Sequence, residues 1–291
     1  MVAMCQPERG PLRFYLSYFF FDSAPPTSQV SHFTAEGVGV FRLPFGWQYM
    51  QSNGLGTTIN AGFFSEYNAL VQAVISAGAI PILDLHNYAR WNGGIVGQGG
   101  PTNANLENVW TQLATYYASS RVIFGLMNEP YSLDMTEWAA TCQGVINAIR
   151  AAGATSQIIL IPGTEYTSAG AFPDDSYSYL AGITDPAHSG STELLYFDVH
   201  QYLDSTYSGT ATTCTTNAVG GLEALNSLLA GAGRYAFLSE TGGGSTSSCE
   251  SDLGQELAYI KSAGQFKGFT AWAAGSFATA SLRIGFALTL G

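Results

Sequence analysis

Charged residues, and basic ones above all, are scarce in this sequence. Only 11% of its 291 residues are charged, and 10 Lys and Arg stand against 21 Asp and Glu, for a formal net charge of -11. Proteins that bind the phosphate backbone of nucleic acids need clustered Lys and Arg, and the sequence contains no basic stripe. The composition therefore argues against a nucleic-acid partner.

Long apolar runs are also missing. No run approaches the ~18 residues that a membrane-spanning helix requires, so we expect a soluble protein with no membrane partner. The hydrophobic fraction of 46% is typical of a globular chain that buries a large core. Since no linker or charge run divides the sequence, we expect residues 1–291 to form a single domain.

Cysteine is rare, with four residues in the chain. Cys214 and Cys249 lie in Thr-rich and Ser-rich segments that do not need a small hydrophobic residue, so we predict a disulfide between them. Cys142 shares a predicted helical face with apolar residues, which indicates a buried free thiol, and Cys5 is left over. One disulfide and few charges favour an extracellular, secreted protein, although no Asn-X-Ser/Thr sequon is present.

The N-terminal stretch is rich in aromatic residues. Residues 14–21 read Phe-Tyr-Leu-Ser-Tyr-Phe-Phe-Phe after Arg9 and Arg13, which has some likeness to a signal peptide. Glu8 interrupts the basic leader, however, and bulky aromatic residues are poor signal-peptide material. We therefore interpret residues 12–21 as a strand and see no clear signal peptide.

Apolar runs and amphipathic segments alternate along the rest of the chain. The runs predict strands at 38–41, 80–85, 122–127, 157–161, 194–199, 235–238 and 269–272. The segments between them predict helices at 63–75, 106–117, 135–151, 218–229 and 253–260. With the stretch at 12–21 as an eighth strand, this alternation predicts an α/β fold of the (β/α)8 TIM-barrel type.

Residues 121–130 are the most informative stretch of the sequence. The apolar run 122–127 ends abruptly in Asn128-Glu129-Pro130, and its lack of alternation is typical of a strand covered on both faces. Pro130 biases Glu129 towards an extended backbone that aims the carboxylate out of the strand mouth. Taken alone, such an acid could equally well face water.

Polar and titratable side chains also follow the other predicted strands. Because the carboxyl ends of all barrel strands meet at one rim, we expect these side chains to surround one pocket. The residues are Arg42, His86, Asn87, Asn128, Glu129, His200, Tyr202, Glu240 and Trp272.

Two of these residues, Glu129 and Glu240, suit glycoside hydrolysis. Retaining glycosidases use two carboxyl groups ~5–5.5 Å apart, one as nucleophile and the other as acid/base. Arg42 and Tyr202 could keep the nucleophile ionised. Asn128 could bind the sugar 2-hydroxyl, and Trp272 offers a flat apolar face to a pyranose ring.

Six segments resemble the fungal endoglucanases of glycoside hydrolase family 5. They are 41–49, 84–94, 127–130 (Met-Asn-Glu-Pro), 198–204, 238–244 and 271–277. The resemblance implies a retaining endo-β-1,4-glucanase that acts on cellulose and related β-glucans. It also implies that Glu129 is the acid/base, that Glu240 is the nucleophile, and that the Cys214–Cys249 pairing matches the family's.

The chain departs from this family at both ends and in one loop. Residues 1–29 and 278–291 differ from the usual elements that close the barrel, so we describe them as atypical. Glu165-Tyr166 occupies a loop where relatives often carry a Trp, which predicts a different distal sugar subsite.

Parts of the sequence pattern also fit other functions. His86, His200, Glu129 and Glu240 could be metal ligands, but neither a His-Glu-X-X-His motif nor paired Cys spacing supports this. The barrel could bind glycans without cleaving them, or act on another β-glycan such as mannan. We expect a monomer that needs no cofactor and no metal.

Overall fold

The computed structural model describes residues 15–18 and 27–274. In this part of the chain eight parallel strands form a closed barrel, in the order β1-β10-β9-β8-β7-β6-β3-β2. This confirms the (β/α)8 barrel predicted from the alternating pattern. The strands are β1 (Tyr15–Tyr18), β2 (Val40–Phe45), β3 (Ile80–Leu85), β6 (Ile123–Gly125), β7 (Ile159–Pro162), β8 (Leu195–Tyr202), β9 (Tyr235–Gly242) and β10 (Phe266–Ala274).

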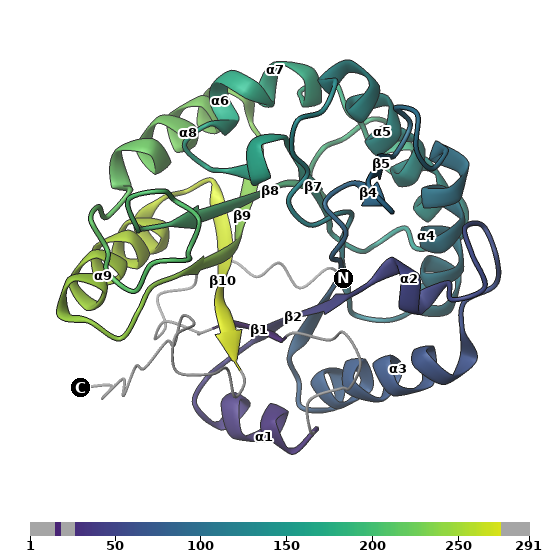
Figure 1. Cartoon of the computed structure of the whole chain (residues 1–291), viewed down its shortest axis with the longest axis horizontal. Helices are drawn as coiled ribbons and strands as arrows, with labels where there is room; N and C mark the ends of the chain where they lie inside the picture. The colour runs from purple at the N-terminus through teal and green to yellow at the C-terminus, as the bar shows by residue number, and fades with distance from the viewer. Residues whose placement is uncertain (1–14, 19–26, 275–291) are drawn as a thin grey trace.

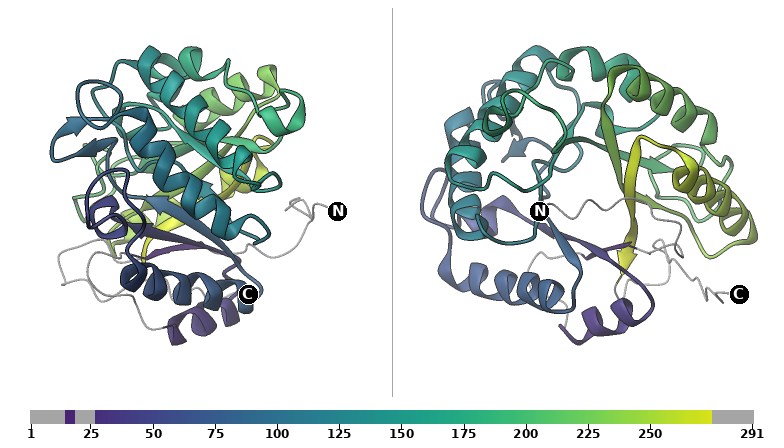
Figure 2. Two further views of the ribbon diagram at one scale, coloured as in Figure 1. Left: turned by 90° about the vertical axis from the view of Figure 1, so that its right-hand side faces the viewer. Right: turned by 180° about the vertical axis from the view of Figure 1, so that it is seen from behind.

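The helices form a ring outside the strands (Figure 1), and Figure 2 shows the same ring from the side and from behind. They are α1 (Ser28–Ala35), α2 (Trp47–Met50), α3 (Ala61–Ser76), α4 (Asn103–Tyr117), α5 (Met135–Ala151), α6 (Phe172–Asp175), α7 (Tyr177–Leu180), α8 (Val219–Ala232) and α9 (Ser247–Ser262), with 3-10 turns η1 (Glu165–Thr167) and η2 (Pro186–His188). Within the described ranges, no helix is both long and apolar enough to cross a membrane.

Several elements of the structure were not predicted from the sequence. They are α1, the short helices α2, α6 and α7, and a small hairpin of β4 (Arg90–Trp91) and β5 (Gly94–Ile95). Each is short, so its apolar pattern covers too few residues to show a period. The hairpin and α2 both lie in loops at the carboxyl ends of strands, the end at which barrel enzymes place their sites.

The N-terminal strand was predicted, and it closes the barrel. Tyr15–Tyr18 pairs with β10 on one side and β2 on the other, within the predicted range 12–21. The remaining parts of segment 1–29, apart from residues 27–29, lie outside the described residues, as do Cys5 and the whole of segment 278–291.

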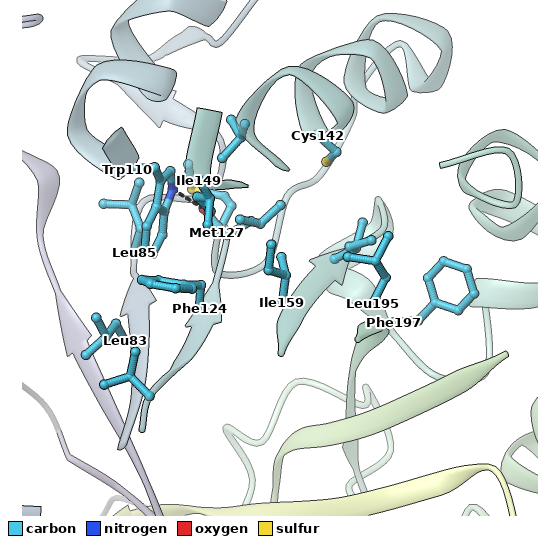
Figure 3. Close-up of a cluster of buried hydrophobic side chains, with 14 of the residues drawn as sticks. Leu83, Leu85, Trp110, Phe124, Met127, Cys142, Ile149, Ile159, Leu195 and Phe197 are labelled. Atoms are coloured by element: carbon cyan, nitrogen blue, oxygen red, sulfur yellow. Dashed lines mark hydrogen bonds between the residues drawn. The ribbon is translucent and has the colours of Figure 1, made fainter. Parts of the chain in front are cut away.

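The main core lies between the strands and the helix ring. Figure 3 shows part of it, including Trp110, Phe124 and Cys142. The indole of Trp110 is fully buried and donates to the carbonyl of Leu126 at 3.1 Å, which ties α4 to the segment that leads from β6 to the rim. Cys142 is a buried free thiol on α5, as predicted.

The barrel interior changes from apolar to charged along the strands. Side chains of Val40, Ile82, Ile123, Leu160 and Phe237 form a separate buried cluster. The next inward positions lie two residues further on, because strand side chains alternate, and they are Arg42, Asp84, Gly125, Pro162 and Ser239. Apolar side chains therefore fill the amino-terminal half of the barrel, and charged groups are buried directly above them.

The predicted disulfide is present. Cys214 and Cys249 are bonded, which joins the loop after β8 to the first turn of α9 across a sequence separation of 35. The bond thus joins the segments that follow β8 and β9, the strands that carry Tyr202 and Glu240.

A buried acid lies between α9 and β9. Glu256 is fully buried, and one of its carboxyl oxygens accepts a hydrogen bond from the hydroxyl of Thr241 at 2.6 Å. The other oxygen has no partner among the described residues. Burial raises the pKa of Glu256 to about 8, so this carboxyl is protonated in the folded protein at neutral pH.

Glu256 therefore makes stability dependent on pH. Between the ordinary Glu pKa of about 4.3 and a value of about 8, the folded chain holds a proton that the unfolded chain has released, so the free energy of unfolding falls as pH rises. We expect Glu256→Gln to raise Tm by about 2–5 °C at pH 8 and by much less at pH 4. Thermal unfolding at the two pH values checks this, and an equal change at both would contradict it.

Candidate active site

Arg42 lies at the centre of the site. It is fully buried, and its guanidinium contacts three side chains: Glu240 Oε1 at 2.5 Å from Nη1, and Asp84 Oδ2 at 2.9 Å and Asn128 Oδ1 at 2.6 Å from Nη2. Burial alone would lower the pKa of Arg42, but the surrounding carboxylates, Asp84 first, raise it above its ordinary value. The guanidinium is therefore a permanent buried cation.

The carboxylate of Glu240 is held at both oxygens. Oε1 pairs with Arg42, and Oε2 accepts a hydrogen bond from the hydroxyl of Tyr202 at 2.6 Å. Glu240 is only 4% exposed. Burial, and then the adjacent negative charge of Glu240, raise the pKa of Tyr202 well above its ordinary value, so the phenol keeps the proton that it donates. Both oxygens of the carboxylate therefore accept from a donor of the protein.

Glu129 lies in a different environment. Burial raises the pKa of its carboxyl, although His86 and Arg42 act in the opposite direction. Oε1 lies 2.8 Å from Nδ1 of His200, and Nε2 of that ring lies 2.9 Å from Oγ of Ser239. Burial lowers the pKa of His200 to about 4. A neutral imidazole therefore connects Glu129 to Ser239.

The backbone of Glu129 differs from the prediction. An extended conformation was expected because proline follows, but the structure has φ +43° at Glu129, in the left-handed region. Two hydrogen bonds hold the preceding residue: Asn128 N donates to Leu85 O at 2.8 Å, and Asn128 O accepts from Tyr88 N at 3.0 Å. With β3 fixing Asn128, the turn at Glu129 directs the carboxyl to His200, and tertiary contacts override the local preference.

The carboxyl groups of Glu129 and Glu240 lie close together. One carboxylate oxygen of Glu129, one of Glu240 and a ring nitrogen of His200 all lie within 4.8 Å of one another. Of the four candidate metal ligands, His86 is not part of this group, because its Nδ1 lies 2.9 Å from Asp84 Oδ2. Two carboxyl groups at this spacing, one bound by Arg42 and Tyr202 and the other with a raised pKa, can act as a nucleophile and a proton donor.

Two buried aspartates lie directly beneath the histidines. Asp84 lies on β3 two residues before His86, which follows the strand, and Asp198 precedes His200 by two residues on β8. Burial tends to raise the pKa of Asp84, but Arg42 lowers it below the ordinary value. Burial raises the pKa of Asp198 to about 7. Neither residue was among the predicted site residues, although the pattern Asp-X-His occurs twice in the sequence.

Trp272 and His86 form a second wall of the site. Their rings stack at a centroid distance of 5.5 Å with 17° between planes, and the guanidinium of Arg42 lies 6.0 Å from the indole centroid. Asn87 lies nearby, but its side chain binds residues of the neighbouring loops. Its Oδ1 accepts from Trp47 N, and its Nδ2 donates to Gln48 Oε1 and Arg90 O. Its polar atoms are thus engaged within the protein.

An aromatic stack follows the acid on the chain. The ring of Tyr131 stacks on that of Tyr166, with 4.8 Å between centroids and 12° between planes. The guanidinium of Arg90, in β4 of the hairpin, lies 3.6 Å from the centroid of the Tyr131 ring. Tyr166 is 49% exposed. Tyr131 and Arg90 were not predicted site residues, and only the loop 165–166 had been singled out from the sequence.

Several predicted strand ends were placed too early, whereas the predicted end at 127 lies two residues beyond the end of β6. Arg42 lies in the middle of β2, not at its end, and His200, Tyr202, Glu240 and Trp272 lie inside β8, β9 and β10. The strands extend further because polar inward-facing residues continue the ladder after the apolar pattern stops. The predicted convergence at the carboxyl-terminal half of the barrel is nevertheless what the geometry shows for Arg42, His86, Asn128, Glu129, His200, Tyr202, Glu240 and Trp272.

Comparisons with known proteins agree with this geometry. Residues 13–277 match the profile of the family described as "Cellulase (glycosyl hydrolase family 5)". Endoglucanase 1 of Saitozyma flava is 54% identical over 88% of this chain and 75% of its own length. A "Manganese dependent endoglucanase Eg5A" of Phanerodontia chrysosporium is 52% identical over 88% of this chain and 67% of its own.

A solved structure shares the fold. The crystal structure of Cel5A (EG2) from Hypocrea jecorina (Trichoderma reesei) superposes with a TM-score of 0.85 at 49% identity, and the match covers 88% of this chain and 79% of that one.

Proposed function

This chain belongs to glycosyl hydrolase family 5, and from that premise we propose that it hydrolyses internal β-1,4-glucosidic bonds of cellulose and related β-glucans by retaining double displacement. In this proposal Glu240 is the nucleophile and Glu129 is the acid/base. The endo-β-1,4-glucanase activity rests on the family and on the endoglucanases to which the chain is similar.

The observation that carries the mechanism is the spacing of the two carboxyl groups. Oxygens of Glu129 and Glu240 lie within 4.8 Å of each other. Retaining enzymes have their carboxyl groups ~5–5.5 Å apart, whereas inverting enzymes need ~6.5–9.5 Å to hold a water between the acid and the base. The short separation supports direct attack by a carboxylate.

The environments of the two glutamates support their separate roles. Glu240, paired with Arg42 and Tyr202, attacks the anomeric carbon, while Glu129 gives its proton to the departing glycosidic oxygen. In the second step Glu129 takes a proton from water, the resulting hydroxide oxygen bonds to the anomeric carbon, and the bond to Glu240 breaks. The raised pKa of Glu129 keeps the acid protonated to higher pH than an ordinary Glu.

The remaining walls of the site suit a sugar chain. Asn128 uses its oxygen to accept from Arg42, and its amide nitrogen has no partner among the described residues, so we assign it to a substrate hydroxyl. The stacked pair of His86 and Trp272 offers an apolar face to the C–H groups of a pyranose.

The pH dependence of the rate should follow from these roles. Activity requires an ionised nucleophile and a protonated acid, so we expect a bell-shaped profile with an acidic optimum. Because burial raises the pKa of Glu129, the alkaline limb should lie above the ordinary Glu pKa of about 4.3. A profile of kcat/KM that stays flat into the alkaline range would contradict the assignment.

A substrate panel tests the proposed specificity. We expect new reducing ends from carboxymethylcellulose and barley β-glucan, lower rates on mannan and xylan, and retention of the β-anomer in the first products by NMR. A preference for mannan would identify another β-glycan as substrate. Binding of β-glucan without new reducing ends would instead favour a glycan-binding barrel.

A metal cofactor is the other function to test, because Glu129, His200 and Glu240 converge and one relative is named as manganese dependent. The residues do not fit a resident cation. The guanidinium of Arg42 already lies 2.5 Å from Glu240, and a second cation there would repel it. We expect EDTA to leave activity unchanged, and activity that is lost to EDTA and restored by Mn²⁺ would overturn this.

We further propose that the protein is a secreted, monomeric, single-domain enzyme. The Cys214–Cys249 disulfide supports an oxidising destination, and a polymeric substrate requires an enzyme that meets it outside the cell.

A further inference from the structure

The loop after β8 is folded around one carboxylate. Oδ1 of Asp204 accepts hydrogen bonds from the backbone amides of Ser208 at 2.9 Å and Gly209 at 3.2 Å, and Oδ2 accepts from that of Ala211 at 3.0 Å. Asp204 is only 2% exposed. Burial tends to raise its pKa, but these amides lower it below the ordinary value, so the loop is built on an ionised group.

The loop that Asp204 holds together places Gly209 against the ring of Tyr202. Gly209 has φ +70°, and a methyl group added there would lie 2.6 Å, 2.7 Å and 2.9 Å from the ring atoms Cδ1, Cε1 and Cγ of Tyr202. The glycine backbone therefore lies directly on the tyrosine ring, in a space that no side chain could share. The same ring carries the hydroxyl that donates to Glu240 at 2.6 Å.

The far end of the loop is fixed as well. Cys214 is bonded to Cys249 on α9, and the amide of Thr215 donates to Leu203 O at 2.8 Å, which closes the loop on itself. With both ends held, the contact between Gly209 and Tyr202 cannot relax by a shift of the whole loop.

We propose that Asp204 and Gly209 are positioning residues for the reaction: Asp204 gathers the loop backbone, Gly209 packs on the ring of Tyr202, and the Tyr202 hydroxyl is thereby aimed at the nucleophile. The inference rests on the proposed role of Glu240. Neither residue touches the reacting atoms. They act through Tyr202 alone.

The direction of a pH effect separates this role from simple electrostatics. The charged and titratable groups that face Glu240 and Tyr202 come from several elements. They are Arg42 from β2, Asp84 from β3, His86 and Tyr88 after β3, Glu129 after β6, and Asp198 and His200 from β8. Removing the negative charge of Asp204 would by itself favour an ionised nucleophile and move the acidic limb of kcat/KM to lower pH. Loss of the Tyr202 hydrogen bond moves that limb to higher pH.

The experiment compares the single variants Asp204→Asn, Gly209→Ala and Tyr202→Phe. It also includes two double variants, in which Asp204→Asn or Gly209→Ala is combined with Tyr202→Phe. We expect Tyr202→Phe to lower kcat about 10-fold and to move the acidic limb up by about one pH unit. Asp204→Asn and Gly209→Ala should move it in the same direction, by up to the same amount, with KM changed less than kcat. In the Tyr202→Phe background neither should move it further to higher pH, and Asp204→Asn should show only the downward effect of its lost charge.

Asp134→Asn is the matched control. Asp134 is another loop carboxylate that accepts from backbone amides, those of Thr136 and Glu137 at the start of α5, without contacting Tyr202. We expect it to change thermal stability and leave the acidic limb in place. Circular dichroism of every variant confirms that the fold is intact, and Asp204→Asn carries the test if Gly209→Ala does not fold.

Two results would overturn the inference. An acidic limb that is unchanged or lowered in folded Asp204→Asn would mean a structural or purely electrostatic role. A further shift to higher pH in the Tyr202→Phe background would mean that the loop does not act through Tyr202. Failure of the proposed function gives a different result: Tyr202→Phe would then leave the acidic limb in place, or Glu240→Gln would retain turnover.

Discussion

Glu240→Gln is expected to lower kcat on β-glucan by about 10⁴- to 10⁶-fold, because an amide oxygen cannot form the covalent intermediate. Glutamine has the same shape, so the contacts with Tyr202 and the sugar walls of the site persist, and binding of cello-oligosaccharides should remain. Release of reducing ends measures the first effect, and calorimetric titration measures the second.

Glu250→Gln provides a control for this substitution. Glu250 is an exposed acid in the first turn of α9, close in sequence to the nucleophile strand and outside the site. It should keep ordinary kcat and KM. Turnover of Glu240→Gln within a factor of ten of the unaltered enzyme would remove Glu240 from the proposed mechanism.

Glu129→Gln is expected to lower kcat about 10²- to 10⁴-fold on unactivated glucans, because the departing sugar must then leave without a proton. Aryl glycosides whose leaving group needs no proton should form the glycosyl-enzyme at close to the ordinary rate, so a burst of released phenol should precede slow turnover. Stopped-flow absorbance with an activated aryl cellobioside measures this burst.

The same variant should also change the pH profile. Since the raised pKa of Glu129 sets the alkaline limb, that limb should disappear from kcat/KM of Glu129→Gln on activated substrates. Glu137→Gln on α5, an exposed acid, is the control that should keep it. An equal loss on activated and unactivated substrates would assign Glu129 a role other than proton transfer.

The barrel could be predicted from the sequence because its signal is local. Each central strand is a short apolar run, and each long helix repeats its apolar residues over several turns, as in α5, where Trp138, Cys142, Val145 and Ile149 are all buried. The convergence of residues from different strands followed from one topological rule, that the carboxyl ends of barrel strands share a rim.

Other features could not be predicted, because they depend on contacts distant in sequence. The left-handed backbone of Glu129 arises from hydrogen bonds of Asn128 with Leu85 of β3 and with Tyr88 after it, whereas the sequence showed only the following proline. Ser239 is inconspicuous beside Glu240, and only the structure places its hydroxyl 2.9 Å from His200. The Asp-X-His pairs were visible in the sequence, and the period of two along a strand could have placed Asp84 and Asp198 beneath the histidines.

The contact between Arg42 and Asp84 has a consequence for the covalent intermediate. When Glu240 becomes an ester it loses its negative charge, and a lone guanidinium sealed in the barrel would then be costly. Asp84, 2.9 Å away, remains as counter-ion throughout the cycle. Asp84 does not take part in the reaction. It therefore balances the charge of Arg42 both while Glu240 is a carboxylate and while Glu240 is an ester of the sugar.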